Sequence, residues 1–332
     1  MISNNIIKKV STILLITLLV NLTPVFADEP EIKIEKIIDF LAFGTGSTTG
    51  TYFPLGNAFA YTWTQKSKKI NVMTHSTNGS FENIELLRNH EINLAIAQSD
   101  TVTAALTGKG KFEGQPYKDL RVLMALYPEV IQIVVASETS NIYKIEDLKG
   151  HRVNVGPANS GNALTAIELL ETMNISSNDY TMINMSYDEV IQAMEKNECD
   201  ATIIIAGVPT KAIIELKKRI PIRILSIDLQ TIIGTTSKLS YLSSFTLSDD
   251  IYGVGKSINT FAVMALLISN KDLKNDLAYN LVKMIFENID YLKIIHERAR
   301  DISIKNALKG LNKMYLHDGA AKYLEELKQK NN

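Results

Sequence analysis

Residues 43–60, FGTGSTTGTYFPLGNAFA, hold the densest run of glycine and hydroxyl residues in the chain. An apolar segment leads into the run and apolar residues at helical spacing follow Tyr52, which predicts a turn from a strand into a helix. Glycines let a ligand approach the backbone closely, and hydroxyls beside the free amides of a helix start favour an anion. We therefore predict a loop that binds a small anion through Gly46, Ser47, Thr49, Gly50, Thr51 and Tyr52.

Two phosphate-binding motifs do not fit this loop. In a dinucleotide fingerprint the third glycine would stand one place earlier than Gly50, and an acidic residue would lie near residues 72–74. A P-loop needs a lysine, and none stands between residues 44 and 64. A glycine turn without a ligand remains the alternative until other loops join it.

Polar residues also follow the next two predicted strands, residues 69–73 and 92–97. Ligands of open parallel α/β sheets bind beyond the carboxyl ends of the strands, so three such loops predict a pocket. The alternative to a ligand contact at Asn78 or Ser80 is that this residue caps the helix that follows. Asp100 would repel an anion, so it binds a ligand ammonium group or fixes a loop. The candidate contacts here are Asn78, Ser80, Asn83, Gln98 and Ser99.

A second part of the chain repeats this arrangement. Residues 120–136 read as two apolar strands, interrupted by residues 127–129, that form the first crossing between lobes. A strand over residues 151–155 then precedes GPANSGN and a helix. We expect Tyr127 to wall the pocket, and Gly207 and Pro209 to shape it, with Pro209 in the first turn of a helix. The candidate contacts of this lobe are Asn159, Ser160, Gly161 and Asn162.

The N-terminus reads as an export signal. Lys8 and Lys9 precede an apolar run over residues 10–20, and small residues stand before Asp28, so residues 1–27 are predicted to be cleaved after Ala27. The alternative is an uncleaved membrane anchor, for which the run is short. Residues 1–27 contain two lysines and no acids, which leaves 33 basic and 36 acidic side chains, a net charge of −3. This charge does not favour nucleic acid as a partner.

The mature length of 305 residues predicts two lobes. The repeated order of strand, polar loop and helix predicts an α/β protein, and we expect a monomer. We assign 28–128 to the first part of lobe 1, 129–258 to lobe 2, and 259–332 to the return crossing and the completion of lobe 1. Residues 229–258 are expected to be loop with short helices, and 277–295 one long helix. Ser186 and Glu189 form a predicted capping box, and Cys199, the only cysteine, a buried core residue.

An enzyme is the less favoured class. The five histidines are scattered, and no H-E-x-x-H, paired-cysteine spacing or G-x-S-x-G elbow occurs. His317 lacks a nucleophile partner, so we expect it to order the C-terminal segment. We predict no catalytic residue, no metal and no cofactor.

From about residue 40 onward the chain resembles solute-binding proteins of the TAXI family, the immunogenic-protein branch of the receptors for tripartite TRAP transporters. The resemblance rests on an ordered set of motifs: FGTGSTTGTYFPLG, NGSFENIELL, INLAIAQSD, ALYPEVIQIVV, DLKGHRVNVGPANSG, AGVP and LHDGAAKY. The chain departs from the family at Ala158 and Asn159, and at LHDGA where LHPGA is common, which puts selectivity in doubt.

The resemblance implies a type II periplasmic-binding-protein fold, with two α/β lobes that close on a solute. It also implies delivery to a TRAP-type permease without ATP, and ligands such as glutamate, glutamine, dicarboxylates or 2-oxo acids. We expect the ligand carboxylate against the amides and hydroxyls of residues 47–52 and 159–162. The alternative partner is a membrane signalling sensor, for which the chain would be the ligand-binding subunit.

Overall fold

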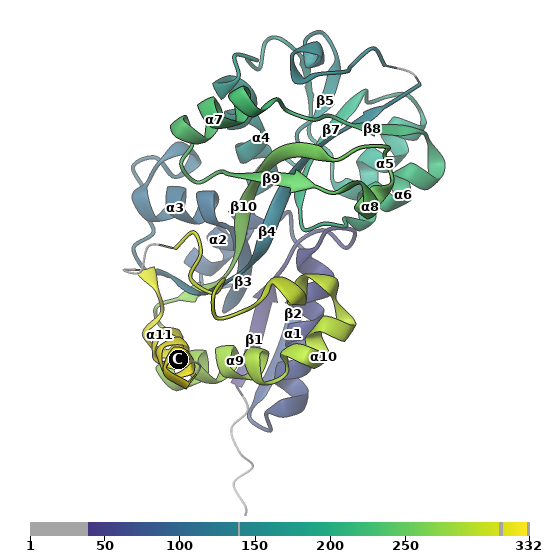
Figure 1. The fold of residues 1–332 in the computed structure, drawn as a ribbon. Coiled ribbons are helices and arrows are strands. Elements are labelled where there is room, and N and C mark those ends of the chain that lie inside the picture. Colours follow the sequence, from purple (N-terminus) through teal and green to yellow (C-terminus); the bar gives the residue numbers. More distant parts are fainter. Residues whose placement is uncertain (1–38, 139, 312–314, 331–332) are drawn as a thin grey trace, which may run out of the picture. The chain divides into compact units, whose positions relative to one another are not determined.

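The structure is a computed structural model that describes residues 39–138, 140–311 and 315–330 (Figure 1). The predicted signal peptide, residues 1–27, lies outside these residues. Within them, ten strands form one sheet in the order β2-β1-β3-β10-β4-β7-β5-β6, with β8 beside β4 and β9 beside β10. The strands are β1 (Asp39–Gly44), β2 (Ile70–His75), β3 (Leu94–Gln98), β4 (Leu120–Ala136), β5 (Arg152–Asn154), β6 (Thr181–Ile183), β7 (Ala201–Ala206), β8 (Ile222–Ile224), β9 (Ser243–Leu247) and β10 (Ile258–Asn270).

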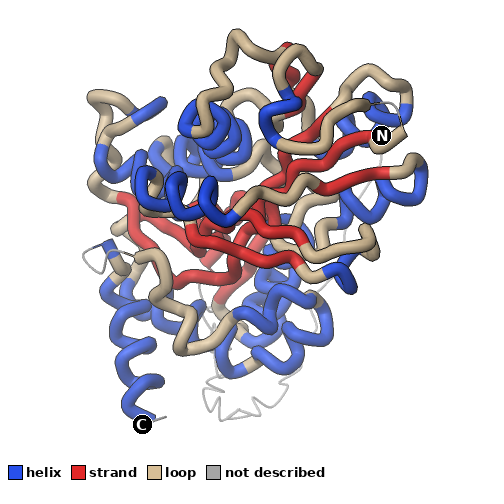
Figure 2. Tube along the Cα trace, turned by 45° about the horizontal axis from the view of Figure 1, so that its top comes forward, coloured by secondary structure: helices blue, strands red, loops and turns tan. Residues whose placement is uncertain are grey.

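Helices connect these strands and cover both sides of the band that they form (Figure 2). The α-helices are α1 (Tyr52–Lys66), α2 (Ser80–Arg88), α3 (Ser99–Thr107), α4 (Gly161–Thr172), α5 (Tyr187–Glu195), α6 (Lys211–Arg219), α7 (Leu229–Lys238), α8 (Asp249–Tyr252), α9 (Asn275–Glu287), α10 (Ile289–Ile295) and α11 (Asp318–Lys330). Short 3₁₀ helices include η1 (Gly110–Phe112), η2 (Ile145–Leu148) and η3 (Glu297–Asp301).

Two long strands, β4 and β10, pair antiparallel and run through both halves of the molecule (Figure 1). The parallel strands β1, β2 and β3 lie on the β10 side, and the parallel strands β5, β6 and β7 lie on the β4 side. Each half therefore has its own parallel strands and its own helices. The predicted fold class is confirmed: an α/β type II periplasmic-binding-protein fold, in which two lobes share two crossing strands.

Apolar clusters cover both faces of the sheet in each lobe, which explains why the inner strands are almost entirely apolar. In lobe 1, Phe43, Phe59 and Trp63 pack with α9 and α11 on one face, while Ile84 and Leu106 of α2 and α3 belong to the cluster on the other. The indole of Trp63 donates a hydrogen bond to the carbonyl of Leu281 at 2.9 Å and so ties α1 to α9.

In lobe 2, the buried residues of α4 cover one face of the sheet and those of α5 and α6 cover the other. Cys199 is fully buried, as predicted. The predicted capping box is confirmed, because Ser186 accepts a hydrogen bond from the Glu189 amide at 3.3 Å and Glu189 accepts one from the Ser186 amide at 2.8 Å.

The prediction that residues 127–129 interrupt the first crossing was wrong, because β4 is continuous. Pro128 pairs with Met264 and Ala125 pairs with Leu266, so β4 has one more residue than β10 over this interval. The extra residue is a β-bulge, and a bulge accommodates a proline that cannot donate to the ladder.

Three further expectations need correction. The predicted helix over 277–295 breaks at Asn288 into α9 and α10. The segment 229–258, predicted as loop with short helices, contains the helices α7 and α8 but also the unpredicted strand β9, which pairs with β10 and has mostly exposed residues that lack strand periodicity. Pro209 precedes the N-cap Thr210 of α6 and therefore lies outside the first turn. No helix of the described residues has the length and apolar character that a bilayer crossing needs.

Candidate functional site

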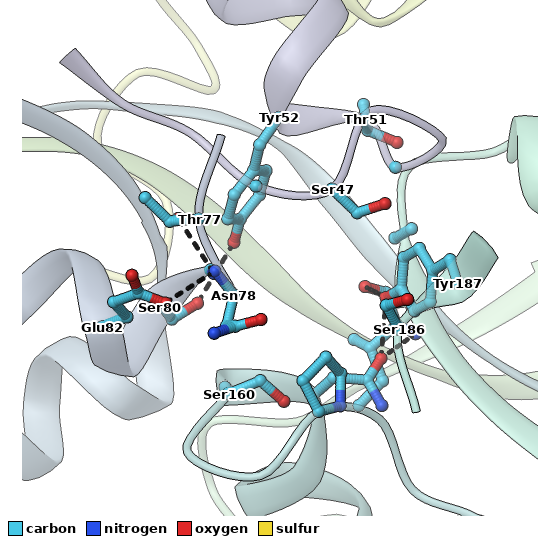
Figure 3. A pocket seen from close by; sticks show the side chains of 18 of the residues that line it. Ser47, Thr51, Tyr52, Thr77, Asn78, Ser80, Glu82, Ser160, Ser186 and Tyr187 are labelled. Carbon is cyan, nitrogen blue, oxygen red and sulfur yellow. Dashed lines mark hydrogen bonds between the residues drawn. The ribbon is translucent and has the colours of Figure 1, made fainter. Parts of the chain in front are cut away.

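A cavity of about 450 Å³ lies between the two lobes (Figure 3). Lobe 1 contributes the loops that begin α1 and α2, together with Gln98 at the end of β3, and β4 contributes Glu129. Lobe 2 contributes the loops that begin α4 and α5 and the end of β7. The lining residues from lobe 2 are Pro157, Ser160, Gly161, Asn162, Ser186, Tyr187, Asp188, Ile205 and Ala206.

The first glycine loop starts α1 at the cavity wall. The amide of Thr45 and the hydroxyl of Ser76 donate to carbonyls of the neighbouring loop and strand, which holds the loops after β1 and β2 together. Thr51 and Tyr52 line the cavity, and no side chain caps the N-terminus of α1. No acidic residue stands in its first turn. The positive end of the α1 dipole is therefore available to a ligand carboxylate.

The second loop starts α2, and its Gly79 adopts φ +94°, a conformation that favours glycine. The amide of Asn83, which is fully buried, donates to the carbonyls of Thr45 at 2.7 Å and Ile96 at 2.8 Å. The Thr77 hydroxyl donates to the Asn83 side chain at 2.7 Å. Asn83 thus fixes α2 to the loops and strands beside it.

In lobe 2, Asn162 has the same role at the start of α4. Its amide donates to the carbonyls of Val155 and Ile203, and its oxygen accepts from the Tyr187 hydroxyl at 2.8 Å and from the Ile205 amide at 2.7 Å. Ser160 caps α4 by accepting a hydrogen bond from the Ala163 amide at 3.0 Å. Ser160 therefore stabilises the start of α4 and also lines the cavity.

The lobes contact each other around the cavity. Ser47 donates to Asp188 at 3.2 Å, and Thr51 donates to the carbonyl of Gly207 at 3.3 Å. Thr165 of α4 donates to Asp100 of α3, and a Cβ atom on Gly161 would lie 2.1 Å from Oε1 of Gln98. The same Cβ atom would lie 2.6 Å from the Cβ of Ser80, so a side chain at position 161 would force α4 or its neighbours in lobe 1 to shift.

The acidic and basic side chains of the cavity wall are all acidic in the described residues. Glu82, Glu129 and Asp188 line it, and none of its lining residues in the described chain is Lys, Arg or His. Glu129 is 2% exposed, and its Oε2 accepts a hydrogen bond from the Tyr52 hydroxyl at 2.7 Å. Burial raises the pKa of Glu129 well above its usual range, and raises the pKa of Asp100 to about 6.

The structure brings eleven of the predicted contact residues to the cavity: Gly46, Ser47, Gly50, Thr51, Tyr52, Asn78, Ser80, Gln98, Ser160, Gly161 and Asn162. The other seven do not line it, although each lies in or beside one of the same loops or strands: Thr49, Asn83, Ser99, Tyr127, Asn159, Gly207 and Pro209.

Several of those seven have other partners. Ser99 accepts from the Met264 amide at 3.3 Å, and Asn159 accepts from Lys111 at 2.6 Å. Tyr127 is fully buried in the lobe 1 cluster.

Asp100, for which the sequence left open a ligand contact or the fixing of a loop, pairs with Thr165, so it fixes a contact between the lobes.

Glu129 and the α5 residues Tyr187 and Asp188 line the cavity but were not predicted. Glu129 stands in the segment that the sequence indicated as a break, and the order Tyr-Pro-Glu after a buried run was the available signal. Asp188 follows the predicted capping Ser186, so its place in a first helical turn could be inferred, but its contact with Ser47 could not. Within the described chain, no cluster of three or more His, Cys, Asp or Glu side chains is arranged to hold a metal ion.

Comparison with known proteins gives a family match and several structural likenesses. The NMT1-like family matches residues 43–327. The alkanesulfonate-binding protein SsuA from Xanthomonas axonopodis pv. citri, bound to MOPS, is 17% identical over 87% of this chain and 84% of its own, with a TM-score of 0.49. A putative L-cystine ABC transporter from Listeria monocytogenes is 14% identical over 83% and 100%, with a TM-score of 0.49.

An extracytoplasmic solute receptor from Bordetella pertussis that binds pyroglutamic acid is 10% identical over 88% of this chain and 94% of its own, with a TM-score of 0.46.

Proposed function

The chain belongs to the NMT1-like family, and from this premise we propose that it is an extracytoplasmic receptor for a small organic acid or amino acid. The observation that carries the proposal is the cavity of about 450 Å³ between the lobes, which is of the size that small molecules occupy. Hydroxyl and amide groups from both lobes line it (Figure 3). A solute in this cavity would contact both lobes at once and stabilise the arrangement in which the lobes are closed around it.

The uncapped start of α1 is the best place for a ligand carboxylate. Its dipole favours negative charge, and the hydroxyls of Ser47 and Thr51 stand beside it. The start of α4 is less open, because Ser160 already accepts the Ala163 amide. We propose that the carboxylate lies nearer α1 than α4.

We further propose that the receptor is exported by its N-terminal segment and passes its solute to a TRAP-type permease. The resemblance of the ordered motifs to those of TAXI receptors supports this choice. We also propose the lobe boundaries given above, 28–128 with 259–332, and 129–258. Vesicles that carry a TRAP-type permease should take up labelled solute only when the receptor is added. Uptake that requires ATP would contradict this partner.

Thermal melting of the purified protein against amino acids, C4 to C6 dicarboxylates, 2-oxo acids and sugars tests the binding function. A ligand at one hundred times its dissociation constant adds about 2.7 kcal/mol to the free energy of unfolding. Co-purified solute is first removed by unfolding and refolding. A rise in melting temperature with an organic or amino acid supports the receptor function. No rise with any compound contradicts it.

A matched pair of variants places the binding in the cavity. Thr48 is an exposed side chain of the cavity wall, so Thr48→Trp should obstruct the cavity without disturbing the core. Thr246 is also an exposed side chain, lies on β9 and does not line the cavity, which makes Thr246→Trp the control. Loss of the melting shift in both variants, or in neither, would argue against this cavity.

A further inference from the structure

Glu129 is a buried carboxylate with too few partners. It follows the bulge of β4, is 2% exposed, and lines the cavity. In the described residues its single hydrogen bond comes from the Tyr52 hydroxyl to Oε2, at 2.7 Å, and no basic side chain forms an ion pair with it. Removing a carboxylate from water without a compensating cation costs several kcal/mol. Its remaining oxygen is free for a ligand.

Other acidic side chains add to the excess of acidic over basic groups in the cavity wall. Glu82 and Asp188 also line the cavity, and the basic Arg298 beside Gly207 is already paired with Glu297 and Asp301 at 3.0 and 2.9 Å. A solute with negative charge alone would therefore enter a cavity whose charged side chains repel it. A solute with a cationic nitrogen would be attracted.

Gln98 supplies an independent sign of a ligand. Its side chain is 2% exposed and lines the cavity, and its Nε2 has no hydrogen-bond partner. Buried amide donors nearly always have a hydrogen-bond acceptor in native proteins, so we expect Nε2 to donate to a bound ligand. Ser80 connects it to the carboxylate: Ser80 lies 3.4 Å from Oε1 of Gln98 and 3.4 Å from the Tyr52 hydroxyl that donates to Glu129.

We propose that the cavity selects a zwitterionic amino compound, whose cationic nitrogen pairs with Glu129 and whose carboxylate accepts hydrogen bonds from Gln98 and the start of α1. The proposal rests on the receptor function and narrows it. Dicarboxylates and 2-oxo acids, which have no cationic nitrogen, are excluded as preferred solutes. Burial raises the pKa of Glu129, and an adjacent cation would offset that cost.

Matched ligand pairs test the proposal on the unaltered protein. Isothermal titration compares L-glutamate with glutarate, L-glutamine with glutaramate, and each further L-amino acid that raises the melting temperature with its deamino acid. The member with an ammonium group should bind at least about 30-fold more tightly, which corresponds to the lower range for truncating a buried charge pair. Equal or tighter binding of the deamino member overturns the proposal while leaving the receptor function intact.

A variant then assigns the selectivity to Glu129. Gln in place of Glu129 keeps the shape of the side chain and an acceptor for Tyr52 but removes the charge. Glu129→Gln should therefore weaken the affinity for the amino compound by about 30-fold and the affinity for its deamino partner by less than about 3-fold. The control Glu325→Gln alters an exposed carboxylate on α11, outside the cavity wall, and should change neither. Equal losses for both partners in Glu129→Gln would overturn the assignment. Binding by no compound of either kind would instead refute the receptor function, and this proposal with it.

Discussion

Replacing Asp100 with asparagine should change how the stability of the protein depends on pH. Asp100 lies in the first turn of α3, is 9% exposed, and accepts a hydrogen bond from Thr165 of the other lobe. Burial raises its pKa from 3.8 to about 6, and the hydrogen bond from Thr165 only partly offsets that rise. Asparagine keeps an acceptor for Thr165 but has no proton to lose.

The magnitude follows from this shift. Between pH about 4 and about 6 the unfolded chain releases the Asp100 proton while the folded protein holds it, so the free energy of unfolding falls as the pH rises. At 1.36 kcal/mol for each pKa unit the full loss is about 3 kcal/mol, of which about 2.5 kcal/mol falls between pH 4 and pH 8. The Asp100→Asn variant lacks this loss. Its stability relative to the unaltered protein should therefore rise by about 2.5 kcal/mol over that interval.

Urea unfolding followed by circular dichroism at pH 4, 6 and 8 measures the difference directly. Glu129 is also buried, and the charge of Asp100 contributes to raising its pKa. Asp100→Asn therefore lowers the pKa of Glu129 as well, which acts in the same direction and adds to the relative gain in stability at pH 8. Asp250→Asn alters an exposed carboxylate on α8 and serves as the control. The reasoning is refuted if the stability difference between Asp100→Asn and the unaltered protein is the same at pH 4 and pH 8.

Three further substitutions have defined outcomes. Ser160→Ala removes the cap of α4 and should lower the free energy of unfolding by about 1 kcal/mol in urea; an unchanged value would refute the capping role. Gly161→Ala places a Cβ atom against Gln98, so titration should show at least a tenfold weaker affinity for the best solute, whereas Gly234→Ala, in open space on α7, should keep the affinity. Trp63→Phe loses the hydrogen bond between α1 and α9 and should cost about 2 kcal/mol of unfolding free energy; a loss below 0.5 kcal/mol, on the order of a surface change, would contradict this.

Local patterns were sufficient for most of the fold. The strand-to-helix turn at residues 43–52 and the capping box at Ser186 are local features, because backbone hydrogen bonds and side-chain caps connect residues close in sequence. The predicted break at Pro128 failed because a bulge, set by pairing with β10, accommodates the proline. The break at Asn288 and the pairing of β9 likewise depend on distant parts of the chain.

The candidate site was predictable only in part for the same reason. The glycine and hydroxyl loops were recognised because the residues that give each loop its binding chemistry are consecutive in the sequence. The contact between Ser47 and Asp188 joins positions 141 residues apart, and no local pattern records it. The significance of Glu129 depends on its burial and on the absence of a cation among the described lining residues, and neither can be read from its neighbours in sequence.

The most direct test of the account is a crystal structure of the protein grown with the compound that gives the largest rise in melting temperature. We expect density for the solute in the cavity between α1, α2, α4 and α5, with its carboxylate at the start of α1 and its nitrogen within hydrogen-bond distance of Glu129. Density for the solute at another place on the protein, or a carboxylate seated against Glu129, would contradict the account.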